Sequence, residues 1–285
     1  MVGFARIFVK IYTQGKFSMT ATQSLQADFS SNTAFAKTGL FMLALSLPVL
    51  IALAIDTREF QDQNVWIKPL KFQLSLALHL LTLAWFAQFL PQTFTARRGY
   101  RMYSYVVIFS ILAEVAWIDG AAMFATASHF NFDSPAMIFI YSIMGVFAVI
   151  LTSPALVYGV IILRKPQLTP FEIASGIALC LTFVLTVIVA GKLSSSGGHF
   201  VGMPSAANLT VPVIGWSREV GDLRVAHFFA THTMHFLPAL AVVLSLALGN
   251  TRLKQANYGA ALIYVAFVAV VFVQALNGLP LLAAS

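Results

Sequence analysis

Seven long apolar segments alternate with polar stretches along the chain. A helix that crosses a bilayer needs about 20 mainly apolar residues. The segments therefore predict membrane spans at roughly 38–55, 68–90, 102–127, 134–163, 170–191, 225–248 and 257–282. None of them has the two-residue alternation of a transmembrane barrel strand. The pattern predicts an all-α fold, a bundle of seven transmembrane helices.

Most of the polar stretches between the spans are short, and two are long. The first, DTREFQDQNVWI, ends beside Trp66, Lys68 and Lys71, which predicts a turn anchored at the membrane interface. The second, at about 192–224, is rich in Gly, Ser and Pro. Loops of this length are uncommon in compact proteins and are often functional. We expect it to fold over the end of the bundle as a lid, with a flexible connector as the alternative.

The chain is expected to have one membrane domain, residues 38–285, preceded by a segment at 1–37. That segment contains FARIFVKIY, which predicts a short amphipathic helix on the membrane surface. The single cysteine, Cys180, excludes an internal disulfide and a thiolate cluster. We expect it to be a small packing residue within its span.

Composition and charge agree with a membrane protein. Hydrophobic residues make up 59% of the chain and charged residues 9%, whereas soluble domains have about 25% charged residues. The net charge of +7 would favour nucleic-acid binding in a soluble protein. Here eleven basic residues fall on one side of the predicted spans and six on the other. The positive-inside rule then predicts a cytoplasmic N-terminus and a periplasmic C-terminus, with the lipid bilayer and no nucleic acid as partner.

Histidines concentrate in the sixth span. Its sequence, RVAHFFATHTMHFLPAL, carries His227, His232 and His235, which share one broad face at 100° per residue. An imidazole in hydrocarbon is costly without a partner. Three on one span predict a bound metal, a bound cofactor or a proton path. Pro238 should also kink this span and free a carbonyl beside His235.

Other spans carry polar residues at matching depths, counted at 1.5 Å per residue. The deep group consists of His79, Glu114, Asp119, His232 and His235, and the shallow group of His129, His199 and His227. All six histidines are candidate metal ligands. Asp119 and Glu114 are expected to orient a ligating histidine or to accept protons.

These residue types are the ligands of zinc, copper or iron, and histidine also holds a b-type haem. The leading hypothesis is a site near the periplasmic face that binds a transition metal or haem b, for redox chemistry or metal handling with a periplasmic partner. His227, His232 and His235 are the preferred ligands, with His199 and His129 at the lid or entrance. Two alternatives stay open. Buried polar groups can simply fasten helices in a non-catalytic accessory subunit, and Gln274 and Asn277 are the further polar candidates for a transport pathway.

Several blocks of the chain resemble a known group of sequences. WIKPLKF, SHFN, GGHFVG, GWS and GDLRVAHFFATH are similar to segments of a family of bacterial polytopic inner-membrane proteins that has no assigned activity. The likeness extends over about residues 40 to 280 and implies a bacterial inner-membrane location. It implies no reaction.

A second resemblance concerns Ser75 and His79, which form SxxxH on the second span. Together with Asp119 and the late pair His232 and His235, they are similar to the seven-helix zinc hydrolases that include alkaline ceramidases and adiponectin receptors. That resemblance implies a zinc-bound water that hydrolyses a lipid amide or ester, with Asp119 as general base and His79 as a ligand. Here the late pair reads HxxH instead of HxxxH and lies on the sixth span instead of the last.

Overall fold

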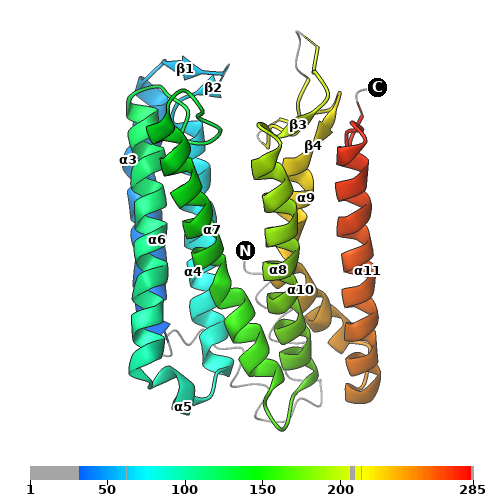
Figure 1. Ribbon diagram of the computed structural model, residues 1–285. Helices are drawn as coiled ribbons and strands as arrows, with labels where there is room; N and C mark the ends of the chain where they lie inside the picture. The colour runs from blue at the N-terminus through cyan, green and yellow to red at the C-terminus, as the bar shows by residue number, and fades with distance from the viewer. Residues whose placement is uncertain (1–31, 62, 206–208, 213, 284–285) are drawn as a thin grey trace. The chain divides into compact units, whose positions relative to one another are not determined.

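The computed structural model describes residues 32–61, 63–205, 209–212 and 214–283, so the amphipathic helix expected near the N-terminus lies outside the described residues. Six described helices are long and apolar enough to cross a membrane, and a bent helix pair makes a seventh span if it is counted as one. The helical, multi-pass prediction is confirmed at this level. The helices are α3 (Thr33–Ile55), α4 (Ile67–Phe86), α6 (Arg98–Met123), α7 (Pro135–Leu163), α8 (Pro170–Ser195), the pair α9 (Leu223–Thr231) and α10 (Thr233–Ser245), and α11 (Asn250–Leu276) (Figure 1).

Short elements connect these helices. The strands β1 (Glu59–Phe60) and β2 (Gln63–Asn64) pair antiparallel in the turn between α3 and α4. The 3₁₀ helix η2 (Ala87–Phe89) and α5 (Gln92–Thr95) lead from α4 to α6. The strands β3 (Phe200–Val201) and β4 (Gly221–Asp222) pair antiparallel across the long loop that follows α8. That loop therefore has a defined pairing at its base.

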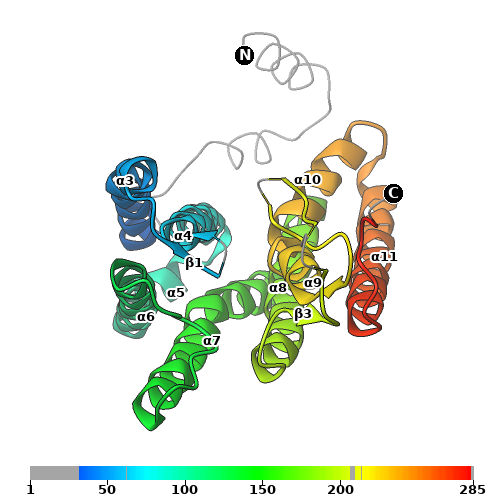
Figure 2. The ribbon, with the colours of Figure 1, turned by 90° about the horizontal axis from the view of Figure 1, so that it is seen from above.

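The predicted membrane domain divides into two compact units. The described part of Phe29–Pro154, together with Ala190–His199, forms the unit that we call the amino-terminal unit. Ala155–Val189 and the described part of Phe200–Ser285 form the carboxy-terminal unit. Helices α3, α4 and α6 pack against one another in the first unit, and α11 packs against α9 and α10 in the second (Figure 2).

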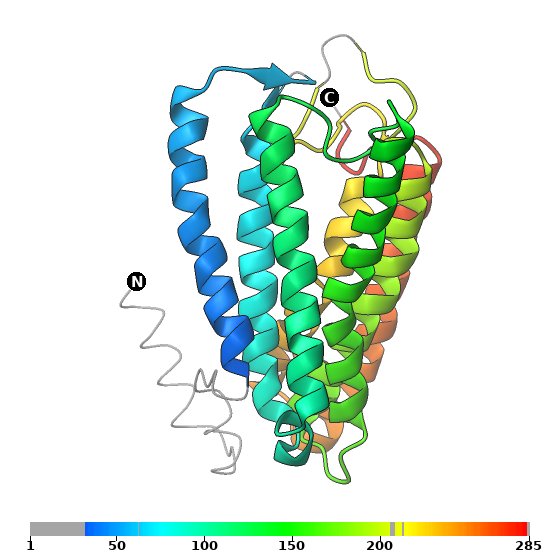
Figure 3. The same ribbon diagram turned by 60° about the vertical axis from the view of Figure 1, so that its left-hand side comes forward.

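Two ends of the amino-terminal unit are tied by polar contacts. Asn32 caps α3, because its side chain accepts a hydrogen bond from the backbone N–H of Phe35. Its amide nitrogen also donates to Tyr100 and Ser104 at the start of α6. At the other end, the β1–β2 hairpin joins the ends of α3 and α4 (Figure 3). Between the two ends the helices contact mainly through apolar residues, and Leu80 and Ile111 are fully buried there.

The start of α8 is fixed by a capping box, in which Thr169 and Glu172 bond each other's backbone N–H.

Helices α7 and α8 approach closely within the carboxy-terminal unit. A Cβ added to Gly159 of α7 would lie 2.6 Å from the sulfur of Cys180 and 2.7 Å from the carbonyl oxygen of Gly176. Small residues at such contacts let the two backbones meet. Cys180 is a packing residue here, as its position in the sequence indicated.

The sixth span breaks at a place that the sequence did not indicate. We expected a kink from Pro238, but α10 is continuous through that residue. The axes of α9 and α10 instead bend by 54° at His232, between Thr231 and Thr233. The third span also ends earlier than predicted, at Met123, and Ala125 follows it with a φ of 50°.

The close contact of α7 with α8 predicts how two substitutions on α7 differ. Gly159→Ala should lower the free energy of unfolding by about 1–3 kcal/mol, because the new methyl group meets backbone and sulfur atoms that cannot move away. Gly145→Ala is the matched control, since no atom lies within 4 Å of the Cβ that it adds. Thermal unfolding in detergent measures both. Equal stability of the two variants would contradict the close contact.

Candidate functional site

Side-chain hydroxyl groups donate hydrogen bonds to backbone carbonyls at the break in the sixth span. A broken helix leaves backbone carbonyl groups without their usual N–H donors, which is costly in a membrane unless other donors replace them. The hydroxyl of Thr233 donates to the carbonyl oxygens of Phe229 and Ala230, at 3.1 and 2.8 Å. The hydroxyl of Tyr264, from α11, donates to the Phe229 carbonyl at 2.8 Å. The break is therefore a stabilised part of the fold.

His232 and His235 contact each other directly at this break. Their Nδ1 atoms lie 3.2 Å apart, and their ring centroids 5.0 Å. For a hydrogen bond between two neutral imidazoles, one Nδ1 must carry the proton and the other must accept it. The two rings are then in opposite tautomers. The pair thus presents a donor and an acceptor nitrogen at one point, inside an apolar helix.

His227 lies on the same span, one and a half turns before the break. Its Nδ1 is buried and has no hydrogen-bond partner among the described residues. Aromatic rings surround this region: Phe228 packs on the His232 ring with centroids 4.3 Å apart, and Trp216 contacts Phe228 at 5.4 Å. These rings make the surroundings of the histidines largely apolar.

The long loop is fixed to the start of α9 by an ion pair. Asp222 caps α9, and its fully buried carboxylate accepts hydrogen bonds from the guanidinium group of Arg224 and the backbone N–H of Ser217. The same guanidinium group donates to the carbonyl of Gly215 at 2.6 Å and lies over the Phe200 ring. The described part of the loop after Phe200 therefore packs against α9, and Trp216 contacts Phe228 of the histidine span.

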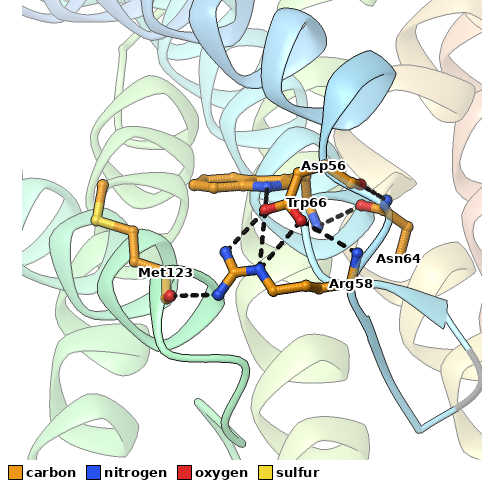
Figure 4. A network of polar contacts seen from close by, with 5 residues as sticks. All are labelled: Asp56, Arg58, Asn64, Trp66 and Met123. Carbon is orange, nitrogen blue, oxygen red and sulfur yellow. Dashed lines mark hydrogen bonds and ion pairs between the residues drawn. The ribbon is translucent and has the colours of Figure 1, made fainter.

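A second ion pair with the same spacing closes the turn after α3 (Figure 4). Asp56 accepts hydrogen bonds from the guanidinium group of Arg58 and, at 2.8 Å, from the indole N–H of Trp66. Arg58 also donates to the carbonyl of Met123 at the end of α6. The guanidinium group and the indole hold the pKa of the Asp56 carboxyl group well below its ordinary value. This network fixes the turn that precedes α4, and the interfacial role expected of Trp66, Lys68 and Lys71 stays a prediction.

Asp119 bonds a glutamine and not one of the predicted histidines. The fully buried Gln73 of α4 donates its amide N–H to Oδ2 of Asp119 on α6, at 2.9 Å. Oε1 of Gln73 and Oδ1 of Asp119 are both buried and have no donor among the described residues. Glu114, one and a half turns earlier on α6, is 4% exposed. Glu114 is therefore buried in the amino-terminal unit, whereas Asp119 is half-buried there.

His79 bonds the backbone of a neighbouring helix. Its Nε2 lies 3.1 Å from the carbonyl oxygen of Leu151, three residues before Pro154 in α7. A proline inside a helix removes one backbone donor and opens the preceding turn, so carbonyls there can accept other hydrogen bonds. Ser75, the other member of the predicted SxxxH pair, is exposed. The structure thus places the two residues in different surroundings.

His129 lies in the loop after α6 and has local partners. Its Nδ1 is 3.2 Å from the hydroxyl of Ser128, and its ring packs against Phe72 and Tyr141. Burial, together with the cation of Lys68, lowers the pKa of His129 to about 3. The ring is therefore neutral over the physiological range. His199 is half-buried and directly precedes β3.

Of the predicted site residues, the structure brings His232 and His235 into contact. Within the described residues, no group of three or more His, Cys, Asp or Glu side chains is arranged to hold a metal ion. Gln274 donates to the nearby carbonyl of Pro280, and Asn277 ends α11. Both pathway candidates therefore have roles at the end of that helix.

Three polar residues with roles near the candidate sites were missed in the sequence. Gln73 lies six residues into α4, so its depth matches that of Asp119 and pointed to a pairing. Thr233 and Tyr264, which bond the carbonyls of the break, gave no such signal. Their role depends on where the span breaks, and the sequence places proline, the usual cause of a break, six residues later.

The two Asp-x-Arg ion pairs predict different costs of removing the arginine. Arg224→Leu should lower the free energy of unfolding by about 3–5 kcal/mol, because it leaves the buried Asp222 carboxylate without its cation. Arg58→Leu is the matched control and should cost less, since its side chain is 49% exposed and that of Asp56 is 20% exposed. Thermal or denaturant unfolding measures both. A greater loss from Arg58→Leu would show that burial does not set these costs.

The lowered pKa of His129 predicts an acid-dependent loss of stability. The unfolded chain takes up a proton near pH 6.5, whereas the folded ring stays neutral down to a pH of about 3. The contribution is therefore present above pH 6.5 and is lost as the pH falls toward 3, by up to about 1.4 kcal/mol per pH unit. His129→Phe keeps a ring and removes this titration. Unfolding midpoints from pH 7 to 4 should fall less steeply in the variant, and identical slopes would contradict the prediction.

No protein-family model, no curated protein and no solved structure matches this chain. The resemblances that its motifs indicate therefore stay predictions.

Proposed function

We propose that the protein is a multi-pass protein of the bacterial inner membrane whose broken sixth span binds a transition metal ion, for metal handling or redox chemistry near the periplasmic face. His232 and His235 are the proposed ligands, with His227 as a third. The observation that carries the proposal is the 3.2 Å separation of the Nδ1 atoms of His232 and His235.

This separation suits two ligands of one ion. Nitrogen ligands lie about 2.0–2.1 Å from zinc, so two of them at a tetrahedral ion are about 3.3 Å apart. Without a metal ion, a hydrogen bond between the two Nδ1 atoms accounts for the same distance. Metal binding would therefore displace that proton and leave the helices nearly unmoved, and it would weaken as the pH falls through the ordinary imidazole range near about 6.5.

The surroundings of the pair support a ligand-binding role. The break keeps the two rings together at the point where the span changes direction by 54°. The buried, unpartnered Nδ1 of His227 is a further acceptor on the same span. Imidazole ligands suit zinc, copper and iron, and one imidazole is also enough to hold a b-type haem.

The orientation of the chain belongs to the same proposal. The side of the predicted spans that carries eleven basic residues, against six on the opposite side, is the cytoplasmic side by the positive-inside rule. With seven spans, this rule places the N-terminus in the cytoplasm and the C-terminus in the periplasm. The long loop and the start of α9 then face the periplasm, so the ion would be exchanged on that side.

A non-catalytic role in an assembly is the second candidate, and the contacts of the amino-terminal unit favour it. His79 bonds the backbone of α7, and Asp119 bonds α4 through Gln73. Intramembrane polar groups used in this way fasten helices. If the histidine pair has the same use, its removal lowers stability and changes no bound ion.

Metal analysis of the purified protein tests the proposal. The chain, stripped with chelator and reloaded with Zn²⁺ or Co²⁺, should retain about one ion and show the absorption of cobalt with nitrogen ligands. His232→Ala and His235→Ala should each weaken binding by more than the roughly 10- to 100-fold that loss of an outer hydrogen-bond partner costs. An optical spectrum of the protein as isolated reports a haem.

The matched control is His79→Ala, which removes an intramembrane histidine outside the pair. It should lose stability and keep the ion, whereas a zinc hydrolase of the SxxxH type requires it to lose the ion. Wild-type protein that retains neither metal nor haem after loading would contradict the proposal. A loss of thermal stability alone in His232→Ala and His235→Ala would favour the accessory role.

A further inference from the structure

The contact of Gln73 with Asp119 leaves two acceptor oxygens unsatisfied. Gln73 uses its amide N–H to reach Oδ2 of Asp119, at 2.9 Å. Its own Oε1 and the second carboxyl oxygen, Oδ1 of Asp119, are buried and lack a donor among the described residues. Buried polar atoms in folded proteins almost always have a partner. A donor is therefore missing at this contact.

A single proton on Oδ1 supplies that donor and satisfies both oxygens. A protonated Oδ1 of Asp119 would be the donor for Oε1 of Gln73, while Oδ2 would keep accepting from the amide N–H. The carboxyl and amide groups then form a closed ring of two hydrogen bonds. The proton also removes the negative charge, which is costly inside a membrane when no cation is paired with it.

We propose that Asp119 and Gln73 form a proton-binding site between α4 and α6, in which Asp119 is a neutral acid. The site lies in the amino-terminal unit and does not depend on the metal proposal. The proton comes from bulk water and returns to it, forming and breaking the O–H bond at Oδ1. Asp119 lies four residues before the end of α6, about 6 Å along the helix axis, so the proton has only a short distance to travel to that end of the helix.

Release of the proton would couple charge to helix packing. The carboxylate would then be charged, and Oδ1 and Oε1 would face each other as two acceptors. Both effects oppose the contact of α4 with α6. Gln73 is fully buried at this contact, so the amide cannot turn to water without moving a helix. Binding of the proton therefore stabilises the contact of α4 with α6, and its release weakens that contact.

Isosteric substitution separates a protonated acid from a carboxylate. Asp119→Asn keeps the shape and supplies an N–H where the proposal places the O–H, so it should unfold at nearly the wild-type temperature. Asp119→Leu leaves the buried amide of Gln73 without its partner, and Gln73→Leu leaves the carboxyl group of Asp119 without its partner. Both variants should unfold at a lower temperature. Asp119→Asn unfolding as early as Asp119→Leu would overturn the proposal.

Infrared spectroscopy provides the second measurement, on the full chain in lipid at neutral pH. The wild-type spectrum should contain a carboxylic acid C=O band that shifts in D₂O and is missing in Asp119→Asn. Gln73→Leu should move this band, because the acid loses its acceptor. Absence of any such band at Asp119, or stabilisation of the wild type but not of Asp119→Asn by added Na⁺ or K⁺, would overturn the proposal in favour of a cation held by a carboxylate.

Discussion

Backbone groups inside a membrane must find partners within the protein, and the break at His232 depends on this constraint. A continuous helix satisfies its own carbonyls, but a broken one does not. Thr233 and Tyr264 donate to the carbonyl of Phe229, and Thr233 also donates to that of Ala230. Because these carbonyls are satisfied, the span can bend by 54° and hold His232 against His235. Tyr264 of α11 therefore contributes to the break that brings the two histidines together.

The two units use the same local ion pair in different surroundings. Asp-x-Arg follows α3 in one unit and begins at the N-cap of α9 in the other, with the same hydrogen bonds between the two side chains. Asp56 and Arg58 lie near the surface and tie a turn to the end of α6. Asp222 is fully buried and fixes the long loop to the histidine span. The spacing of the two residues sets the geometry of the ion pair. Its burial sets how much stability is lost when the arginine is removed.

The polar residues within the membrane serve different purposes in the two units. In the amino-terminal unit they bond neighbouring helices, as His79 does with Leu151 and Gln73 with Asp119. In the carboxy-terminal unit His232 and His235 bond each other beside an aromatic cluster. Hydrogen bonds between helices account for the first pattern. The second pattern joins two residues of one span, and the proposed metal site rests on this contact.

The sequence by itself determined the helices and which of them carry ionisable residues, because apolar length and polarity are local properties of a segment. It also indicated the packing role of Cys180. Only the tertiary structure decided the partners. Gln73 and Asp119 are 46 residues apart, and His79 and Leu151 are 72 apart. Which side chains meet depends on the rotation of each helix against its neighbours and on where a span breaks. Residue depth along a single helix does not contain that information.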